Sequence, residues 1–324
     1  MDRRSEPADI AAMRRDVEAL TAPGERVVGG PGLALARRWL VDRLAMLGLE
    51  PYHGWFEWPY EHAGIRFCNL LARIPGQQSA LDPLLLAAHY DTCGAQPGAD
   101  DNAAAVAILL ACVDALRAAA LRRDVILAMF DAEEPPYFLS EQMGSVHFYH
   151  QQRREPTHCA IVLDLCGHDV PVPGLEDLLF VTGMESAPGL DRTIVEGETL
   201  PGLRTVAVSN EHIGDLSDHH AFRRAGRPFL FLTCGRWEHY HAPTDTPERL
   251  SYGKMLRIRD WVVRAAVDIA DRTLAPEEGY DPTPTELRSL RQNLGPVLEA
   301  LGIEVRTRAD IGRVVAGAIQ LFGV

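Results

Sequence analysis

The sequence predicts an α/β fold whose mixed, mostly parallel central sheet is covered by helices on both faces. The first observation is a set of three continuous apolar runs of strand length, at residues 84–88, 125–130 and 160–163. Runs without alternating polar residues are typical of strands buried on both faces, as in a parallel sheet. The second observation is that helical stretches, 102–121 and 141–153, separate these runs. Strands that alternate with helices favour parallel strands joined by crossover helices.

The other predicted elements extend the same pattern. Residues 33–47 carry apolar side chains at helical spacing, and Gly48 follows them as a typical helix end. Three more strands and one more covering helix are predicted at residues 178–182, 205–208, 228–233 and 261–274. A chain of 324 residues is long enough to bury a sizeable core without needing disulfides or metal to fold.

The C-terminal part of the chain differs in composition from the rest. Residues 275–284 are rich in proline and acidic side chains, which is typical of a linker. Helical stretches follow at 286–301 and 309–321, and we expect them either to pack on the main domain or to form a contact in a homo-oligomer. We therefore divide the chain into an α/β domain, residues 1–275, and a linker with a C-terminal helical extension, residues 276–324.

The acidic composition limits the partners of the protein. The chain has 45 acidic and 32 basic residues and a formal charge of −13. Nucleic acid and anionic membranes need a positive face, so we expect neither as a main partner. Residues 1–15 lack the apolar stretch of a signal peptide, and the longest uncharged apolar run, 103–113, is too short to cross a bilayer. The six cysteines have no CxxC spacing, so we expect free thiols and a cytoplasmic location.

Residues that can bind metal follow each of the three apolar strands. His89 and Asp91 come after the first strand, Glu133 and Glu134 after the second, and Asp164 ends the third. The carboxyl ends of parallel strands meet at one edge of a sheet, where ligands bind in open α/β folds. Each residue alone has an ordinary structural explanation, such as a core histidine or a solvated loop. Together they form a buried carboxylate cluster, which is costly unless a cation compensates it.

Two further segments carry candidate ligands. Asp101 directly precedes the predicted helix at residues 102–121, which is rich in alanine. An acidic residue at this place can also serve simply as a helix cap. Residues 238–245 hold His239 and His241 on either side of Tyr240. We expect His239, together with His212 and His168, to lie at the surface.

The segment Ser217-Asp218-His219 contains the residue types of a hydrolytic triad. Adjacent residues cannot place their side chains in the required relay, so we reject that interpretation.

Five motifs occur along the chain in the order HYD, GADDN, DAEE, LDLCG and YHAPTD. In this order they resemble the motifs of the co-catalytic zinc aminopeptidases of metallopeptidase clan MH. That group includes the bacterial leucyl-type aminopeptidases and, more distantly, the glutaminyl cyclases. The resemblance covers residues 23–274 and implies the zinc-exopeptidase (phosphorylase/hydrolase-like) architecture.

The resemblance also implies a ligand set. It assigns His89 and Asp164 to one zinc ion, Glu134 and His241 to the other, and Asp101 to both as a bridge. Nitrogen and oxygen ligands of this kind suit zinc, and a shared carboxylate is typical of two-metal sites. We therefore expect two Zn²⁺ ions per chain.

The resemblance gives roles to three more residues. Asp91 resembles the acid that orients the ligand imidazole, Glu133 matches the general base, and Tyr240 resembles a residue that hydrogen-bonds the substrate carbonyl oxygen. Residues 217–222 resemble the SDHxxF loop of the family, so Asp218 and His219 are expected close to the site.

The expected function is that of an aminopeptidase, a zinc hydrolase whose partner is a peptide or small amide substrate. A glutaminyl cyclase with one zinc is the alternative, although such enzymes typically carry Trp where this chain has Tyr240. Carboxypeptidases or amidohydrolases on the same scaffold would need a cation for the substrate carboxylate, and Arg236 or Arg223 could serve. A non-catalytic binding module would have lost a ligand or the base, and every expected group is present.

The sequence departs from the leucyl-type pattern in two ways. Pro135-Pro136-Tyr137 follows Glu134, where those enzymes usually have a glycine-rich turn. Two prolines stiffen the loop, which we expect to line the substrate pocket. The second departure is the missing secretion signal, since many relatives are exported.

Overall fold

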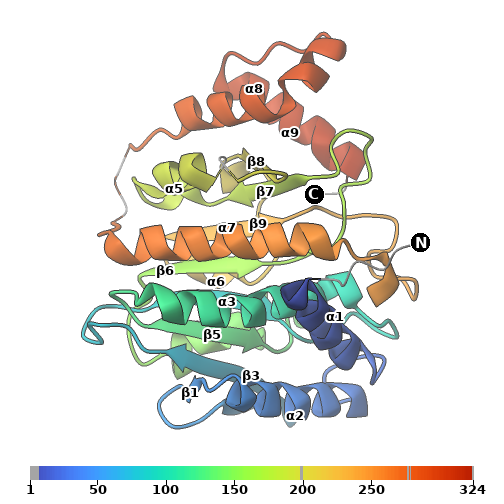
Figure 1. Cartoon of the computed structure of the whole chain (residues 1–324), viewed down its shortest axis with the longest axis vertical. Helices are drawn as coiled ribbons and strands as arrows, with labels where there is room; N and C mark the ends of the chain where they lie inside the picture. The colour runs from blue at the N-terminus through green and yellow to red at the C-terminus, as the bar shows by residue number, and fades with distance from the viewer. Residues whose placement is uncertain (1–6, 198–199, 276, 278, 323–324) are drawn as a thin grey trace.

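The residues described in this computed structural model, 7–197, 200–275, 277 and 279–322, contain a mixed nine-stranded sheet (Figure 1). The strand order is β1-β3-β5-β4-β6-β9-β7-β8, and β2 also pairs with β3. The central strands β5, β4, β6 and β9 are parallel, whereas β3 and β7 join them antiparallel on either side. This topology confirms the predicted fold class. The strands are β1 Glu50–Pro51, β2 Glu57–His62, β3 Ile65–Ile74, β4 Leu84–His89, β5 Val125–Phe130, β6 Cys159–Leu163, β7 Leu178–Thr182, β8 Arg204–Ala207 and β9 Phe229–Thr233.

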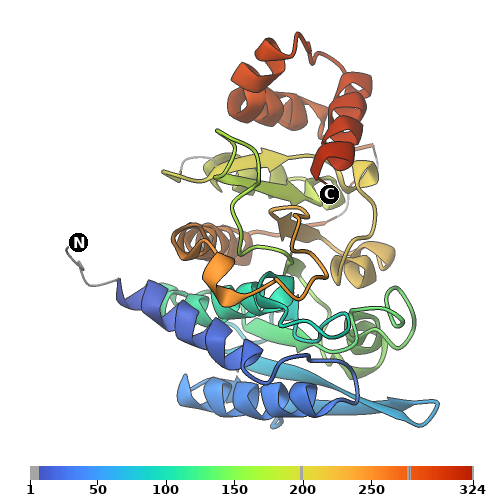
Figure 2. The ribbon, with the colours of Figure 1, turned by 90° about the vertical axis from the view of Figure 1, so that its right-hand side faces the viewer.

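Helices cover both faces of the sheet (Figure 2). The helices α1, α2, α3 and α7 pack over one face, and α4 and α6 cover the other. Helices α5, α8 and α9 lie near β7 and β8. The helices are α1 Ala8–Thr21, α2 Pro31–Met46, α3 Ala105–Ala119, α4 Gly144–His147, α5 Leu190–Gly197, α6 His219–Arg224, α7 Tyr252–Asp271, α8 Thr283–Ala300 and α9 Arg308–Phe322.

Successive residues of the central strands are buried in two different cores. Leu86 of β4 belongs to the large core beneath α1, α3 and α7, whereas its neighbours Leu85 and Ala87 belong to the core that contains Phe148 and Phe222. All six residues of β4 are buried. This double burial explains why the strand reads as an uninterrupted apolar run.

The predicted elements match the structure best where the chain is fully buried. The three apolar runs are β4, β5 and β6, and they are neighbours in the sheet. The predicted helix at 261–274 is the second half of α7, which begins at Tyr252. Its first half contains Lys254, whose ammonium group is buried because it donates hydrogen bonds to the carbonyls of His168 and Glu176. A lysine at this buried position interrupts the apolar spacing from which the first half of the helix would have been predicted.

The apolar segment Ala99–Ala119 has the length and composition of a helix that could cross a membrane, but 67% of its 18-residue apolar window is buried inside the fold. It consists of the irregular turn η1 Ala99–Ala104 followed by α3. Helix α3 packs against α7 and α1, so this segment is the central core helix of the molecule.

Helix α8 binds directly to the outermost strand, β8. The Ser289 hydroxyl accepts the backbone N–H of Ala207 at 2.9 Å, and the Asn293 amide donates to the carbonyl of Thr205 at 2.8 Å. Glu286, which is fully buried, accepts the N–H of Ser209 at 2.6 Å. Of the two arrangements left open by the sequence, the structure therefore has the C-terminal helices packed on the sheet. The division at residue 275 stays a prediction.

Candidate metal centre

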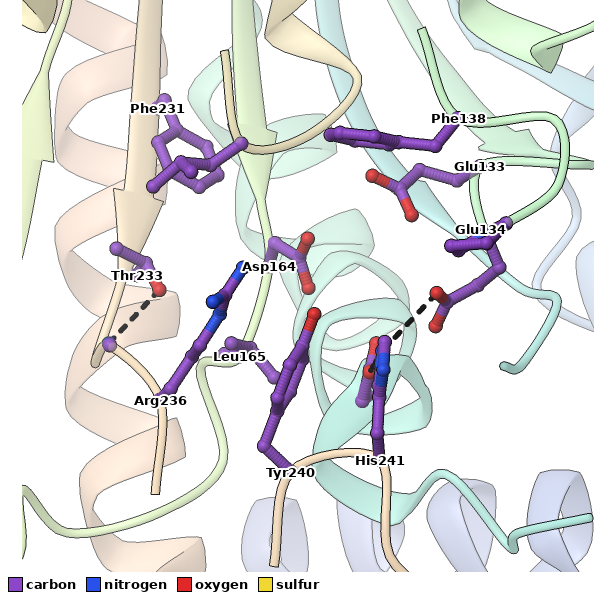
Figure 3. A pocket seen from close by; sticks show the side chains of 14 residues that line it. Glu133, Glu134, Phe138, Asp164, Leu165, Phe231, Thr233, Arg236, Tyr240 and His241 are labelled. Atoms are coloured by element: carbon purple, nitrogen blue, oxygen red, sulfur yellow. Dashed lines mark hydrogen bonds and ion pairs between the residues drawn. The ribbon is translucent and has the colours of Figure 1, made fainter. Parts of the chain in front are cut away.

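The structure brings the five predicted ligands to one place at the carboxyl edge of the sheet. Figure 3 shows three of them, Glu134, Asp164 and His241. His89 is the last residue of β4, Glu134 lies just beyond β5, and Asp164 directly follows β6. These three strands are adjacent, so their ends meet. Asp101 comes from η1, and His241 comes from the segment that follows β9.

Asp101 lies between the two imidazoles. Its Oδ1 is 3.3 Å from His89 Nε2, and its Oδ2 is 3.2 Å from His241 Nε2. Asp164 Oδ1 lies 3.5 Å from His89 Nε2, and Glu134 Oε2 lies 3.2 Å from His241 Nε2. Two sets result, each with one imidazole and one carboxylate of its own, and both share Asp101. This is the donor arrangement of a two-metal site with a bridging carboxylate.

The polar atoms of this cluster fit a bound cation. Glu134 is 4% exposed and Asp101 2% exposed. Buried polar groups in proteins are nearly always paired, and buried charges need compensation. Six buried atoms of the cluster nevertheless lack a hydrogen-bond partner among the described residues: His89 Nδ1 and Nε2, Asp101 Oδ2, Glu134 Oε1, Asp164 Oδ1 and His241 Nε2. Nitrogen and oxygen donors that converge in this way suit zinc.

Burial and neighbouring charges shift the pKa values in the cluster. Burial and the neighbouring Asp101 raise the pKa of Glu134 to about 8. Burial alone would lower the pKa of His241, but the carboxylates of Asp101 and Glu134, each 3.2 Å from its Nε2, raise it to about 9. Burial likewise works against Asp101, yet the imidazoles on its two oxygens hold its pKa below the ordinary range. The position of Asp101 between two imidazoles thus favours its ionised form.

Asp91 holds one ligand and the loop that carries another. Its Oδ1 lies 3.3 Å from His89 Nδ1, the ring nitrogen that faces away from Asp101 and Asp164. The same carboxylate accepts the backbone N–H of Glu133 at 3.2 Å and of Glu134 at 3.1 Å. Asp91 therefore orients the imidazole and fixes the DAEE loop against it.

Asp245 holds the segment that contains Asp101. Its two carboxylate oxygens accept the backbone N–H of Asp100 at 2.8 Å and of Asp101 at 3.1 Å. The YHAPTD motif contains Asp245, but its residue type alone gave no indication of this contact.

Asp100 ties η1 to the end of β6. Its carboxylate accepts the N–H of Gly167 at 2.6 Å and lies 2.7 Å from Nδ1 of His168. The predicted surface position of His168 is wrong, because the ring is fully buried and stacks on Trp237 at 4.5 Å between centroids. Its position is explained by the carboxylate of Asp100, which compensates the buried imidazole.

Sequence reasoning also missed Arg26, which is fully buried behind the site. Its guanidinium donates to the carbonyls of Tyr90 at 2.7 Å, Pro97 at 2.6 Å and Gly98 at 2.9 Å. Burial lowers its pKa to about 10, so it stays charged at neutral pH. Arg26 thus joins the HYD and GADDN segments and places a positive charge beside the carboxylates. It lies far upstream of every motif, where no pattern singles it out.

A pocket of about 160 Å³ opens at the ligands (Figure 3). Apolar side chains form much of its wall: Phe138, Leu165, Leu216 and Phe231. Pro135 and Phe138 line it from the loop after Glu134, which confirms the expected position of that loop. The pocket also contains Glu133, Tyr240 and Arg236.

The candidate base and the candidate hydrogen-bond donor both line this pocket. Glu133 Oε2 lies 3.8 Å from His89 Nε2, and burial raises the pKa of Glu133 well above its ordinary value. The Tyr240 ring stacks on His241 with 3.8 Å between centroids. Burial and nearby Asp101 raise the pKa of Tyr240, so its hydroxyl keeps its proton.

The residues of the rejected triad form no relay. His219 is fully buried, stacks on Phe231 at 4.3 Å between centroids and has Nε2 3.3 Å from the carbonyl of Gly214. Asp218 is also fully buried, and burial raises its pKa to about 7. His219 therefore supports the pocket from behind through Phe231.

The cysteines are free, as the sequence predicted. Cys93 is the one that approaches the site, since its sulfur lies within 4.8 Å of ligand atoms of Glu134 and His241.

A family model described as Peptidase family M28 matches residues 69–266, a range that includes all five predicted ligands. The chain belongs to peptidase family M28. A curated relative, the Escherichia coli (strain K12) protein named "Uncharacterized protein YfbL", is 28% identical over 211 residues, which are 56% of this chain and 65% of that protein. The match therefore spans less than two thirds of that relative.

Solved structures share this M28 fold. A leucine aminopeptidase precursor from Bacteroides thetaiotaomicron has a TM-score of 0.65 at 16% identity and covers 81% of this chain and 97% of its own. A Zn-dependent exopeptidase from Parabacteroides distasonis has a TM-score of 0.65 at 16% identity, with coverages of 81% and 98%. The Fimbriiglobus ruber glutaminyl cyclase has a TM-score of 0.64 at 20% identity, with coverages of 83% and 97%. At these identities the likeness shows the fold alone.

Membership of M28 supports an enzyme of the peptidase family that uses zinc. The resemblance inferred from the five motifs is thereby confirmed. The structural neighbours include both exopeptidases and glutaminyl cyclases, so the roles of individual ligands, the number of zinc ions and the reaction are matters for proposal.

Proposed function

We propose that this M28 protein is a two-zinc aminopeptidase that hydrolyses the N-terminal peptide bond of short peptides. The observation that carries the proposal is the position of Asp101, whose two oxygens face His89 and His241 at 3.3 and 3.2 Å. A carboxylate placed in this way would help to hold two ions, and Asp164 and Glu134 would complete the separate sets.

When bound, zinc supplies a Lewis acid that polarises the scissile carbonyl and makes water acidic enough to attack near neutral pH. Glu133 lies beside the ligands and is well placed to take the proton of the attacking water and to pass it to the leaving amine. Its raised pKa supports the second half of this role, since a carboxylic acid must hold a proton before it can donate one.

The pocket walls support binding of a peptide end. Tyr240 keeps its hydroxyl proton, so it can donate a hydrogen bond to the oxygen on which negative charge develops. Phe138, Leu165 and Phe231 offer apolar surface for the side chain of the N-terminal residue. The free thiols support a cytoplasmic location, and the charge of −13 supports peptides rather than nucleic acid or membrane as partners.

The proposal is tested by measuring bound metal and reaction products on the same preparation. We expect two zinc ions per chain and release of the free N-terminal amino acid, with one water added to the products in mass spectrometry. Glu133→Gln is expected to keep its zinc and lose the activity. A glutaminyl cyclase would instead bind one zinc and remove ammonia from N-terminal glutamine without cleaving the peptide, and that outcome would replace the proposal.

A further inference from the structure

Arg236 is a cation on the pocket wall without a carboxylate partner among the described residues. Figure 3 shows its side chain reaching into the pocket from the segment after β9. Its guanidinium carbon lies 4.7 Å from the centroid of the Tyr240 ring. This contact occupies a face of the guanidinium group and leaves its N–H edge free to donate hydrogen bonds.

The backbone that carries Arg236 is fixed. Thr233, the last residue of β9, accepts the N–H of Gly235 through its hydroxyl at 3.0 Å. Cys234 donates its N–H to the carbonyl of Leu165 at 2.9 Å. The arginine therefore follows a turn whose backbone is held by two hydrogen bonds, which lowers the entropy cost of binding a ligand group.

The charged groups near Arg236 do not explain why an arginine occupies this position. The other titratable groups that line the pocket near the ligands are the candidate base Glu133, the carboxylates that zinc would compensate, and His241, which would itself be a zinc ligand. Arg223, the second cation suggested by the sequence, forms an ion pair with Asp215 and is not part of the pocket wall. Arg26 gives its hydrogen bonds to backbone carbonyls. With zinc bound, Arg236 is the cationic side chain on the described pocket wall that a substrate would meet in addition to the metal.

We propose that Arg236 binds a carboxylate that the substrate carries beside the scissile bond. The inference rests on the proposed aminopeptidase function and specifies its substrate class. The planar fork of arginine matches a carboxylate with two parallel hydrogen bonds. The carboxylate can be the free C-terminus of a dipeptide or an acidic side chain on the N-terminal residue. The apolar walls favour the dipeptide, because they leave the side-chain site suited to an apolar residue.

The experiment compares matched substrates with the zinc-loaded enzyme. The first pair is leucyl-alanine and leucyl-alaninamide, which differ only in the C-terminal carboxylate. The second pair is a glutamyl and a glutaminyl tripeptide amide, which differ only in the N-terminal side chain. We expect the enzyme to prefer leucyl-alanine over its amide, with the difference in KM rather than in kcat.

The variant Arg236→Met should remove that preference. Hydrogen bonds to charged groups contribute enough that KM for leucyl-alanine should rise about 10- to 100-fold, while leucyl-alaninamide is unaffected. Arg236→Lys should keep part of the preference, since it retains the charge but not the fork. Arg38→Gln, an exposed change on α2, controls for the loss of one positive charge.

Each outcome decides between the alternatives. A preference for the glutamyl substrate that is lost in Arg236→Met would identify the side chain as the source of the carboxylate. Equal activity on both members of each pair, or an equal loss on all substrates in Arg236→Met, would overturn the inference and leave the aminopeptidase proposal standing. If no substrate is cleaved, the aminopeptidase proposal fails. Calorimetric binding of leucyl-alanine and its amide to Glu133→Gln then still tests Arg236, because the same preference is expected in binding.

Discussion

Single side chains in this protein hold several parts of the site at once. Asp91 contacts an imidazole and two backbone N–H groups, and Arg26 joins two ligand-bearing segments through three carbonyls. Such residues contact the ligands without being ligands, so their effect on metal binding is indirect. Their loss is expected to move the ligands rather than remove them.

Asp91→Asn tests this indirect role. The amide has the size of the carboxylate but cannot accept from both N–H groups of the DAEE loop and also face His89 Nδ1. We expect zinc affinity to fall about 10- to 100-fold with the fold retained, measured by competition with a chromophoric chelator. The exposed change Asp114→Asn serves as control. Unchanged affinity in Asp91→Asn would show that packing alone orients the imidazole.

His219 makes stability depend on pH. Burial lowers its pKa from 6.5 to about 4 in the folded chain. The unfolded chain therefore binds this proton more readily, so stability that is complete above pH 6.5 is lost as the pH falls toward 4. Between pH 7 and pH 5 the protein should lose about 2 kcal/mol relative to His219→Gln, measured by urea unfolding. A parallel pH dependence of the two proteins would contradict this prediction. The exposed change His62→Gln should run parallel to the unchanged protein.

At the scale of secondary structure, the sheet positions the ligands, because β5, β4 and β6 are adjacent and parallel. Their ends deliver Glu134, His89 and Asp164 to one edge, and η1 delivers Asp101 across it. Close packing between η1 and the turn after β6 sets the position of Asp101. A Cβ atom on Gly167 would lie 2.6 Å from the Cβ of Ala104 and 2.8 Å from Oδ1 of Asp100.

Gly167→Ala is therefore expected to displace Asp100 and, through it, Asp101. Overpacking of this kind costs about 1–3 kcal/mol of stability, and zinc affinity should fall with it. Thermal unfolding and the chelator competition measure the two effects. In Gly317→Ala, within α9, the new Cβ meets nothing within 4 Å, so that variant should keep its zinc affinity and be about 0.5–1 kcal/mol more stable. Wild-type zinc affinity in Gly167→Ala would refute this account of the packing.

The sequence predicted the buried strands and the ligand-bearing loops because both follow rules of local pattern. Double burial makes β4, β5 and β6 continuous apolar runs, and the carboxyl ends of parallel strands are where ligands gather. Strand β3 escaped prediction because Asn69, buried within it, is polar; its amide donates to Gly144 and Gln152. The buried His168 and Arg26 escaped because their partners lie far away in the chain. A buried polar side chain whose hydrogen-bond partner lies far away in the chain leaves no local signal in the sequence.

At the scale of the whole molecule, α8 completes the sheet. The outer edge of β8 would otherwise present the N–H of Ala207 and the carbonyl of Thr205, and side chains of α8 bind both. Apolar side chains such as Leu290 and Ile311 are buried in the same region. The C-terminal helices are therefore expected to be needed for the stability of the strand pair β7–β8.

Ser289→Ala measures how much the contact between α8 and the edge of β8 contributes to the stability of the protein. It leaves the buried N–H of Ala207 without its acceptor, which costs about 1–3 kcal/mol, and chemical unfolding should report the loss. Ser79→Ala, at an exposed position, should not change the stability.

A chain that ends at residue 275 should form soluble aggregates, detected by light scattering. A monodisperse, stable truncated chain would show that β8 does not need its cover.

The opposite end of the sheet is protected by other means. There β2 pairs with β3 and carries Pro59, which has no N–H to donate, between the charged residues Glu57 and Glu61. A proline and like charges discourage a further strand from adding at this end, as the side chains of α8 do at the other. The β2 and β8 edges therefore both disfavour the addition of a strand from a second copy. The number of strands in the sheet is therefore set within a single chain. If copies of the protein associate, they should do so through helical faces.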